Sequence, residues 1–184
     1  RDFNTSEVVK MLIAGIIGSE GKLQTASIIN SILTSKGEKV SIIDSKSMPG
    51  FDGKKIKAYI NELEKNNIDL LMLKTGLPDI DRFLPEDIRF DILVYTDKAK
   101  DSDNFDRKEH ITRLKRIFSL MAEKSVAIVN DDDSQLIDLL QGMRHRFITY
   151  GFNAKASVTT SSVGDTVSKD GFICCLQRPI STRE

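Results

Sequence analysis

Short apolar runs alternate with segments of helical periodicity in the first third of the chain. Met11–Ile17 is an apolar run, and the segment Gly21–Ser35 that follows it is amphipathic. Val40–Ile43 and Lys54–Lys65 repeat the same order. Because short apolar runs are typical of buried strands and three- to four-residue spacing is typical of helices, this part predicts the order strand, helix, strand, helix.

The middle of the chain continues this pattern. Ile68–Leu73 and Ile92–Tyr95 are predicted strands, and Arg107–Ala122 is a predicted helix with apolar residues every three or four positions. The connection from Thr75 to Arg89 contains two prolines. We expect it to form a loop with short helical turns.

The last third begins with the same alternation and then changes. Strands are predicted at Val126–Val129 and Phe147–Tyr150, with a helix at Ser134–Gln141 between them. The predicted strands are short, apolar and rich in β-branched residues, as buried parallel strands are. From Ala156 onward Ser and Thr alternate with apolar residues. We therefore predict one α/β domain over residues 1–184, with a mainly parallel sheet flanked by helices and a small antiparallel extension over about 151–184.

Composition excludes several kinds of partner. The 184 residues suit one domain with a single core. The 27 basic and 27 acidic residues cancel and are interspersed, so nothing predicts binding to nucleic acid or to an anionic membrane. No apolar run approaches the roughly 20 residues that span a bilayer, and no signal peptide is visible. We expect a cytoplasmic protein and, because the chain begins at Arg1, a fragment of something longer.

The two cysteines, Cys174 and Cys175, are adjacent in an apolar run without a neighbouring Cys or His cluster. Side chains of consecutive strand residues point to opposite faces. We predict that both are reduced packing residues.

The segment between the first strand and the first helix has the composition of a phosphate-binding loop. Gly15, Gly18 and Gly21 could let backbone N–H groups converge on a phosphate at a helix N-terminus. Lys22 could add charge at the outer phosphates. On these residues alone the loop is either a nucleotide site or a tight strand-to-helix turn.

Two positions depart from the strict motif G-x-x-x-x-G-K-[ST]. Ile16 occupies the first glycine position, and Leu23 replaces the hydroxyl that binds Mg²⁺. Gln24 is a poorer ligand for a hard cation than a carboxylate or hydroxyl. The candidate loop site consists of Gly18, Ser19, Glu20, Gly21, Lys22 and Leu23.

Four segments in the right order resemble motifs of one known family. "AGIIGSEGKLQ" (Ala14–Gln24) is similar to A-G-x-T-G-T-N-G-K-T-T, and "FDILVYTDKAKDSDNFD" (Phe90–Asp106) to F-D-x-x-V-F-T-N-L-x-x-D-H-L-D-F-H. Arg113–Leu140 resembles a helix with A-K-x-x-L-F followed by a strand ending in N-x-D-D. "ITYGF" (Ile148–Phe152) resembles T-Y-G-F. The chain thus resembles the central, ATP-binding domain of the Mur ligase family, which implies a P-loop-containing fold.

The resemblance implies a particular chemistry. In the family, ATP phosphorylates a carboxylate, and an amine displaces the phosphate to form an amide while Mg²⁺ neutralises the phosphates. Here the implied metal-ligand positions are Leu23, Leu73 or Lys74, and Ser102. The family's bracing helix lysine falls at Leu114, unless the alignment slips by one residue to Lys115. The resemblance therefore implies ATP as the cofactor but gives little support for Mg²⁺.

The nucleoside end of the implied site is better preserved. Asn130 closes the fifth predicted strand, where the family has an Asn at the adenine edge. The acidic run Asp131–Asp133 could cap the next helix or contact ribose, and capping is the interpretation we favour. His110 and His145 lie on charged segments, where we expect solvated rather than catalytic side chains.

Two functional hypotheses follow. The first is a relative that has lost its metal site and serves as a weak, non-catalytic ATP-binding or scaffold module, with flanking ligase domains or a protein partner. The second is the ATP-binding domain of a divergent carboxylate-amine ligase in cell-wall precursor or related biosynthesis. An unrelated P-loop NTPase would need an acidic residue at the end of a strand near Leu73, and "LMLK" has none.

Overall fold

The computed structural model describes residues 10–19, 21–96, 107–161, 173–177 and 179. The described strands are β1 (Leu12–Ile17), β2 (Val40–Asp44), β3 (Leu70–Thr75), β4 (Phe90–Tyr95), β5 (Met121–Asn130), β6 (Arg146–Gly151), β7 (Val158–Ser161) and β8 (Ile173–Leu176). The helices are α1 (Lys22–Ser35), α2 (Gly53–Lys65), the 3₁₀ turn η1 (Leu77–Asp79), α3 (Ile80–Phe83), α4 (Arg107–Ser119) and α5 (Ser134–Leu140).

These strands form one sheet with the order β2-β3-β1-β4-β5-β6-β7-β8. All neighbouring strands are parallel except β7 and β8. Every residue of β3 is buried, as expected for a central strand of a parallel sheet. The predicted α/β fold with a mainly parallel sheet is confirmed.

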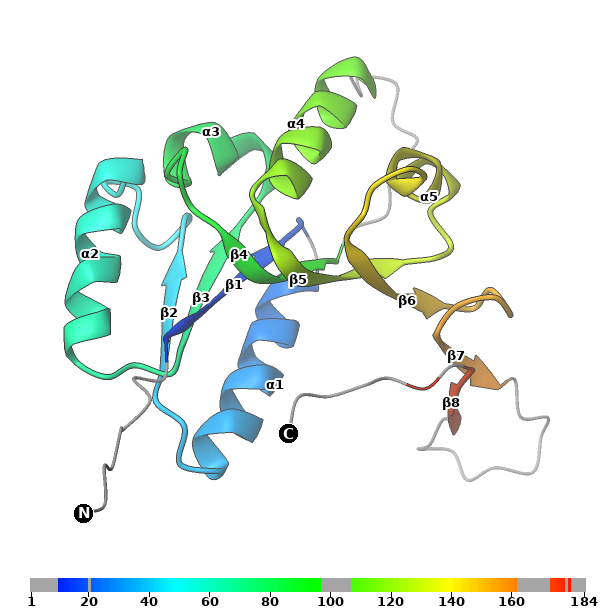
Figure 1. Ribbon diagram of the computed structural model, residues 1–184, viewed down its shortest axis with the longest axis horizontal. Coiled ribbons are helices and arrows are strands. Elements are labelled where there is room, and N and C mark those ends of the chain that lie inside the picture. The colour runs from blue at the N-terminus through cyan, green and yellow to red at the C-terminus, as the bar shows by residue number, and fades with distance from the viewer. Residues whose placement is uncertain (1–9, 20, 97–106, 162–172, 178, 180–184) are drawn as a thin grey trace, which may run out of the picture.

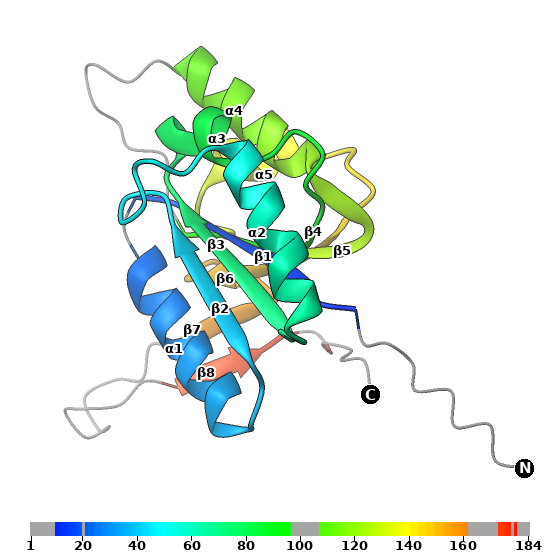
Figure 2. The ribbon, with the colours of Figure 1, turned by 90° about the vertical axis from the view of Figure 1, so that its left-hand side faces the viewer.

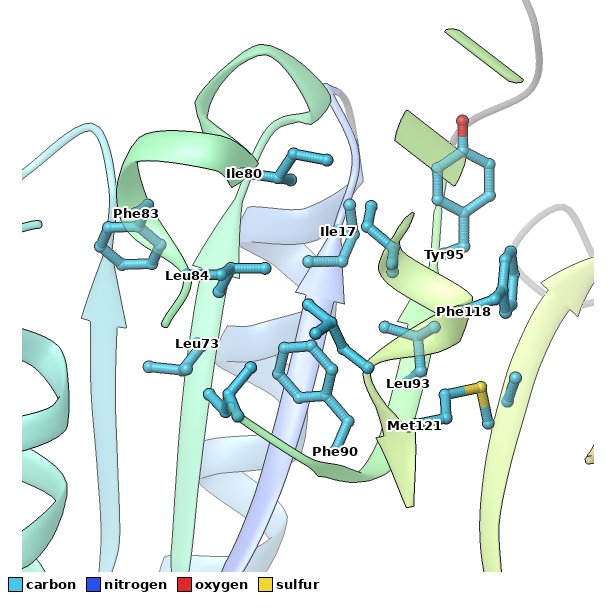
Figure 3. Close-up of a cluster of buried hydrophobic side chains, with 14 of the residues drawn as sticks. Ile17, Leu73, Ile80, Phe83, Leu84, Phe90, Leu93, Tyr95, Phe118 and Met121 are labelled. Carbon is cyan, nitrogen blue, oxygen red and sulfur yellow. The ribbon is translucent and has the colours of Figure 1, made fainter. Parts of the chain in front are cut away.

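Helices cover the two faces of the sheet unequally. In Figure 1, α1 lies on one face and α2, α3, α4 and α5 lie on the other, and Figure 2 shows the same two layers from the side. The α1 face buries a small cluster that includes Ala14, Ala26 and Met72. The opposite face buries the larger core, in which Leu73 and Phe90 contribute (Figure 3). Because strand side chains alternate, neighbouring residues of β3 serve different layers.

The connection between β3 and β4 contains η1 and α3, so the predicted short helical turns are confirmed. The helix predicted at Arg107–Ala122 ends earlier, at Ser119. Met121 is instead the first residue of β5, where it pairs with Phe90 and is buried. The prediction was wrong for these last residues because their apolar spacing fits a helix and a buried strand start equally well.

The predicted C-terminal extension is present as the antiparallel pair of β7 and β8. However, β7 itself joins the sheet through a parallel pairing with β6. Within the described residues, Cys174 and Cys175 are both free thiols, as expected. Cys174 is exposed, so its predicted packing role is wrong, and the reason is that β8 is the last strand of the sheet in this part of the chain.

Across the described ranges, no helix combines the length and apolar character needed to cross a membrane.

Candidate functional site

The glycine loop connects β1 to α1, with Lys22 as the first helical residue. Gly21 is the N-cap and has a φ of 74°, a left-handed conformation that favours glycine. Gly15 has a different role from the one we expected. It lies within β1, and a Cβ there would be 2.9 Å from Cε1 of the Phe90 ring. Gly15 therefore serves close packing between strands, whereas Gly18 and Gly21 shape the loop.

Lys22 folds back over the loop that precedes it. Its Nζ donates hydrogen bonds to the carbonyl oxygens of Gly18 at 2.6 Å and Ser19 at 3.1 Å, and the residue is only 5% exposed. The ammonium thus lies over the backbone that would surround a phosphate. Glu20, also predicted for this site, lies outside the described residues.

The loop is attached to the end of β3. The N–H of Gly18 donates to the carbonyl oxygen of Thr75 at 3.1 Å. One residue earlier, the N–H of Ser45 after β2 donates to the carbonyl oxygen of Lys74 at 2.9 Å. The ends of three neighbouring strands are therefore connected through backbone hydrogen bonds at the predicted loop.

The structure separates the two candidates for the implied metal position on β3. Leu73 is completely buried in the core on the face opposite α1. Lys74, by alternation, lies on the α1 side, where its Nζ is 3.1 Å from Oδ2 of Asp44. The side chain of Lys74 is 8% exposed and that of Asp44 is 17% exposed. Lys74, not Leu73, is the β3 side chain that belongs to the site.

A pocket of about 710 Å³ opens beside the glycine loop. We name it the lysine pocket, because its lining contains three lysines and one aspartate. The residues of its lining are Ser19, Gly21, Lys22, Leu23, Gln24, Thr25, Ile28, Asp44, Lys46 and Lys74. This balance of charge, next to loop N–H groups and a helix N-terminus, suits a polyanion.

Asp44 stays ionised in this surrounding. Desolvation by burial pushes its pKa upward, but hydrogen bonds from the N–H of Lys46 and the ammonium of Lys74 outweigh that effect. The charge of Lys74 and the Ser47 hydroxyl add to the lowering, so the pKa of Asp44 lies below its usual value of 3.8. Asp44 and Lys74 therefore form an ion pair, with Oδ2 and Nζ 3.1 Å apart.

The residues at the implied metal positions do not fit Mg²⁺. Leu23 is 62% exposed and carries no donor atom, and Lys74 presents an ammonium, which repels a cation. Among the described residues, no group of three or more His, Cys, Asp or Glu side chains could hold a metal ion. Ser102 lies outside the described residues.

The implied helix lysine is also missing from the site. Leu114 packs in the core on the face opposite α1, and Lys115 is exposed. A one-residue slip in the alignment therefore does not bring an ammonium into the lysine pocket.

At the end of β5, Asn130 is used locally. Its Oδ1 accepts a hydrogen bond from the N–H of Asp132 at 2.9 Å. Asp133 caps α5, since its Oδ1 accepts from the N–H of Leu136 at 3.1 Å. The capping interpretation is confirmed for this residue.

Asp132 has a role that the sequence did not indicate. Its two carboxylate oxygens accept from the N–H groups of Phe152 and Asn153, both at 2.9 Å. A Cβ at Gly151 would lie 2.8 Å from Oδ2 of Asp132, so the glycine leaves room for this carboxylate. Asp132 thus fixes the turn after β6.

Asp131 lines a smaller pocket of about 390 Å³ together with Ser134 and Lys155. The expectation for the two histidines was wrong in one respect, because both are partly buried rather than solvated. Of the two pockets described, neither includes His110 or His145 in its lining.

Sequence reasoning missed Asp44 and Lys46 as pocket residues. The signal was present, because Asp44 ends an apolar run and parallel strands that end in charged residues bring those side chains to one edge. What the sequence does not reveal is that β2 and β3 are neighbours with Asp44 and Lys74 in register.

Comparison with known proteins identifies the family of the chain. The family model described as Mur ligase middle domain matches residues 16–178. A curated relative, the UDP-N-acetylmuramoyl-L-alanyl-D-glutamate--2,6-diaminopimelate ligase of Geobacter sulfurreducens, is 24% identical over an alignment that covers 92% of this chain and 37% of the relative.

Solved structures give the same result for the fold. The structure of a UDP-N-acetylmuramoyl-L-alanyl-D-glutamate--2,6-diaminopimelate ligase superposes with a TM-score of 0.67 at 17% identity, covering 91% of this chain and 39% of that one. The MurF ligase from Thermotoga maritima in complex with ADP gives a TM-score of 0.54 at 16% identity, covering 83% and 35%. The chain spans little more than a third of the length of these proteins. It belongs to the Mur ligase middle domain family.

Proposed function

We propose that this domain binds the phosphates of ATP or ADP in the lysine pocket and has lost the metal-dependent catalysis of a ligase. It would then act as a weak nucleotide-binding or scaffold module beside further domains or a protein partner. The observation that carries the proposal is the pair of buried ammonium groups, Lys22 over the loop and Lys74 where a metal ligand is implied.

Several features support the nucleotide part. The loop retains Gly18 and Gly21 at the N-terminus of α1, which provides N–H groups and positive potential for an anion. A structural neighbour with the same fold was solved in complex with ADP. Asn130, if it exchanges its local hydrogen bond for the base, would lie at the nucleoside end.

The donor atoms at the implied metal positions support the loss of catalysis. Phosphoryl transfer depends mainly on fixed positive charge that stabilises the transition state, and the metal usually supplies it. Leu23 and Lys74 cannot hold that metal. We therefore infer that the domain does not transfer the γ-phosphoryl group.

Calorimetric titration with ATP tests the binding. We expect weak affinity, with a dissociation constant on the order of 1 mM, about −4 kcal/mol. Lys22→Met should abolish the binding heat, whereas Lys36→Met, an exposed lysine just past the far end of α1, should leave it unchanged. Equal affinity in wild type and Lys22→Met would refute the proposed site.

The second candidate is the ATP-binding domain of a divergent carboxylate-amine ligase. The observation that favours it is that the relatives named above are ligases and extend well beyond the part that this chain matches. A phosphate-release assay with the chain and its flanking domains separates the two functions. Turnover that disappears in Lys22→Met would refute the non-catalytic function and support the ligase function.

A further inference from the structure

Lys74 differs from the other two lysines of the pocket in how it is held. Lys46 is exposed, and Lys22 bonds to its own loop. Lys74 is buried on β3 and, among the described residues, Asp44 is the ion-pair partner of its ammonium. An ammonium has three donors, so within the described part of the chain two of the three remain for a ligand in the pocket.

The position of Lys74 is fixed by the sheet. It pairs with Ile16 of β1 on one side and with Asp44 of β2 on the other. The next residue, Thr75, accepts the hydrogen bond from Gly18 of the glycine loop. The sheet therefore places the positive charge of Lys74 next to the glycine loop.

We propose that Lys74, held by Asp44, is the resident cation of the lysine pocket, so that the pocket binds a di- or triphosphate as the metal-free anion. The proposal rests on the proposed function and adds that the phosphates bind without a metal ion. Mg²⁺ then weakens binding for two reasons. It removes negative charge from the phosphates, and it brings a divalent cation close to an ammonium that cannot move away.

The role of Asp44 is to hold the ammonium in place. A buried ammonium costs free energy unless an opposite charge compensates for its lost hydration. The carboxylate at 3.1 Å provides that opposite charge. One lysine paired in this way provides a fixed charge at a single point, which can replace a divalent cation in binding but leaves no metal for phosphoryl transfer.

The primary experiment is calorimetric titration of the chain with ATP, in EDTA and in excess Mg²⁺ at equal ionic strength. We expect binding about tenfold tighter in EDTA, a difference of about 1.4 kcal/mol. Affinity that is equal in the two media, or tighter with Mg²⁺, overturns the proposal.

Variants then identify the residue responsible. In EDTA, Lys74→Met should weaken ATP binding about tenfold, and Lys46→Met, which removes an exposed charge from the same pocket, should weaken it by less than about threefold. The double variant Asp44→Asn/Lys74→Met leaves the net charge of the pocket unchanged and no unpaired carboxylate. This double variant should still bind ATP about tenfold more weakly than wild type, because the affinity depends on the fixed ammonium and not on the net charge of the pocket. Wild-type affinity in this double variant overturns the proposal.

A charge reversal at position 74 should reverse the effect of Mg²⁺ on ATP binding. Lys74→Glu places a second carboxylate beside Asp44 and should make ATP binding depend on Mg²⁺. Melting temperatures of all variants, measured without ligand, show whether each is folded. A folded Lys74→Glu variant that still binds ATP more tightly in EDTA contradicts the proposed role of the ammonium.

Inorganic tripolyphosphate separates this proposal from the proposed function. If tripolyphosphate binds in a manner that depends on Lys74 and ATP does not bind, the nucleotide function is wrong and the resident cation stands. If ATP binding is lost in Lys22→Met but unaffected in Lys74→Met, the nucleotide function stands and the resident cation is wrong. Absence of binding by both probes refutes both.

Discussion

Two regions at the same edge of the sheet use charge in opposite ways. At the ends of β1, β2 and β3, three lysines and Asp44 line a pocket of about 710 Å³. At the ends of β5 and β6, Asp132 and Asp133 point their carboxylates at backbone N–H groups of the chain itself. A row of charged residues after a strand thus has no single meaning. The partners of each side chain decide whether it binds a ligand or holds the fold.

The largest expected effect comes from a charge placed one residue before Lys74, on the lysine-pocket side of this comparison. Leu73→Glu buries an unpaired carboxylate in a fully buried core position and should destabilise the domain by about 4 kcal/mol or more, enough to prevent folding. Circular dichroism and thermal melting measure this. Lys74→Met is the matched control, because position 74 faces the pocket and methionine introduces no buried carboxylate, and it should remain folded. A folded Leu73→Glu variant would show that the assignment of the two faces is wrong.

The next effect concerns the β5–β6 side. Asp132→Ala removes the acceptor of two backbone hydrogen bonds and should lower the free energy of unfolding by about 2 kcal/mol. Urea denaturation provides the value. Asp131→Ala, a neighbouring carboxylate, should cost much less. ATP affinity in EDTA should be the same in both variants, and a loss of affinity specific to Asp132→Ala would place the acidic run in the ligand site.

A smaller effect is expected at the cap of α5. Asp133→Ala should cost about 1 kcal/mol because the N–H of Leu136 loses its acceptor. Asp133→Asn retains an acceptor oxygen and should recover most of the stability in the same urea experiment. If Asn and Ala destabilise equally, the carboxylate acts through its charge and not through the cap.

The smallest effect is a pH dependence on the lysine-pocket side. The pKa of Asp44 is lower in the folded chain than its usual 3.8. The stabilisation from its ionised form is therefore fully present above pH 3.8 and is lost as the pH falls through the lower folded value. Comparing acid denaturation of wild type and Asp44→Asn isolates this contribution. The two curves should converge as Asp44 becomes protonated, and curves that stay parallel throughout would contradict the ion pair.

Much of the fold follows from the sequence because short β-branched runs and three- to four-residue spacing are strong local signals. Met121 shows the limit of these signals, since the same apolar residue fits the end of α4 or the start of β5. Only its pairing with Phe90 on another strand decides between the two. The parallel pairing of β7 with β6 is a long-range property of the same kind.

The candidate site was predicted less completely. Gly18, Gly21 and Lys22 are placed at the loop as expected, because their role depends on residues next to each other in sequence. The choice between Leu73 and Lys74 could not be made from sequence, since it depends on which face of β3 is turned toward α1. Asp44 was missed because its partner is 30 positions away and becomes adjacent only through the register of β2 and β3.

The backbone bond from Gly18 to Thr75 joins the glycine loop to the end of β3, and the bond from Ser45 to Lys74 joins the end of β2 to the same strand. Such a pocket is preorganised, so an incoming anion does not have to order the chain and the entropic penalty of binding is reduced. These two amide protons are also internal reporters. Their rates of hydrogen exchange should slow when the pocket is filled, which lets occupancy be followed without labelling the ligand.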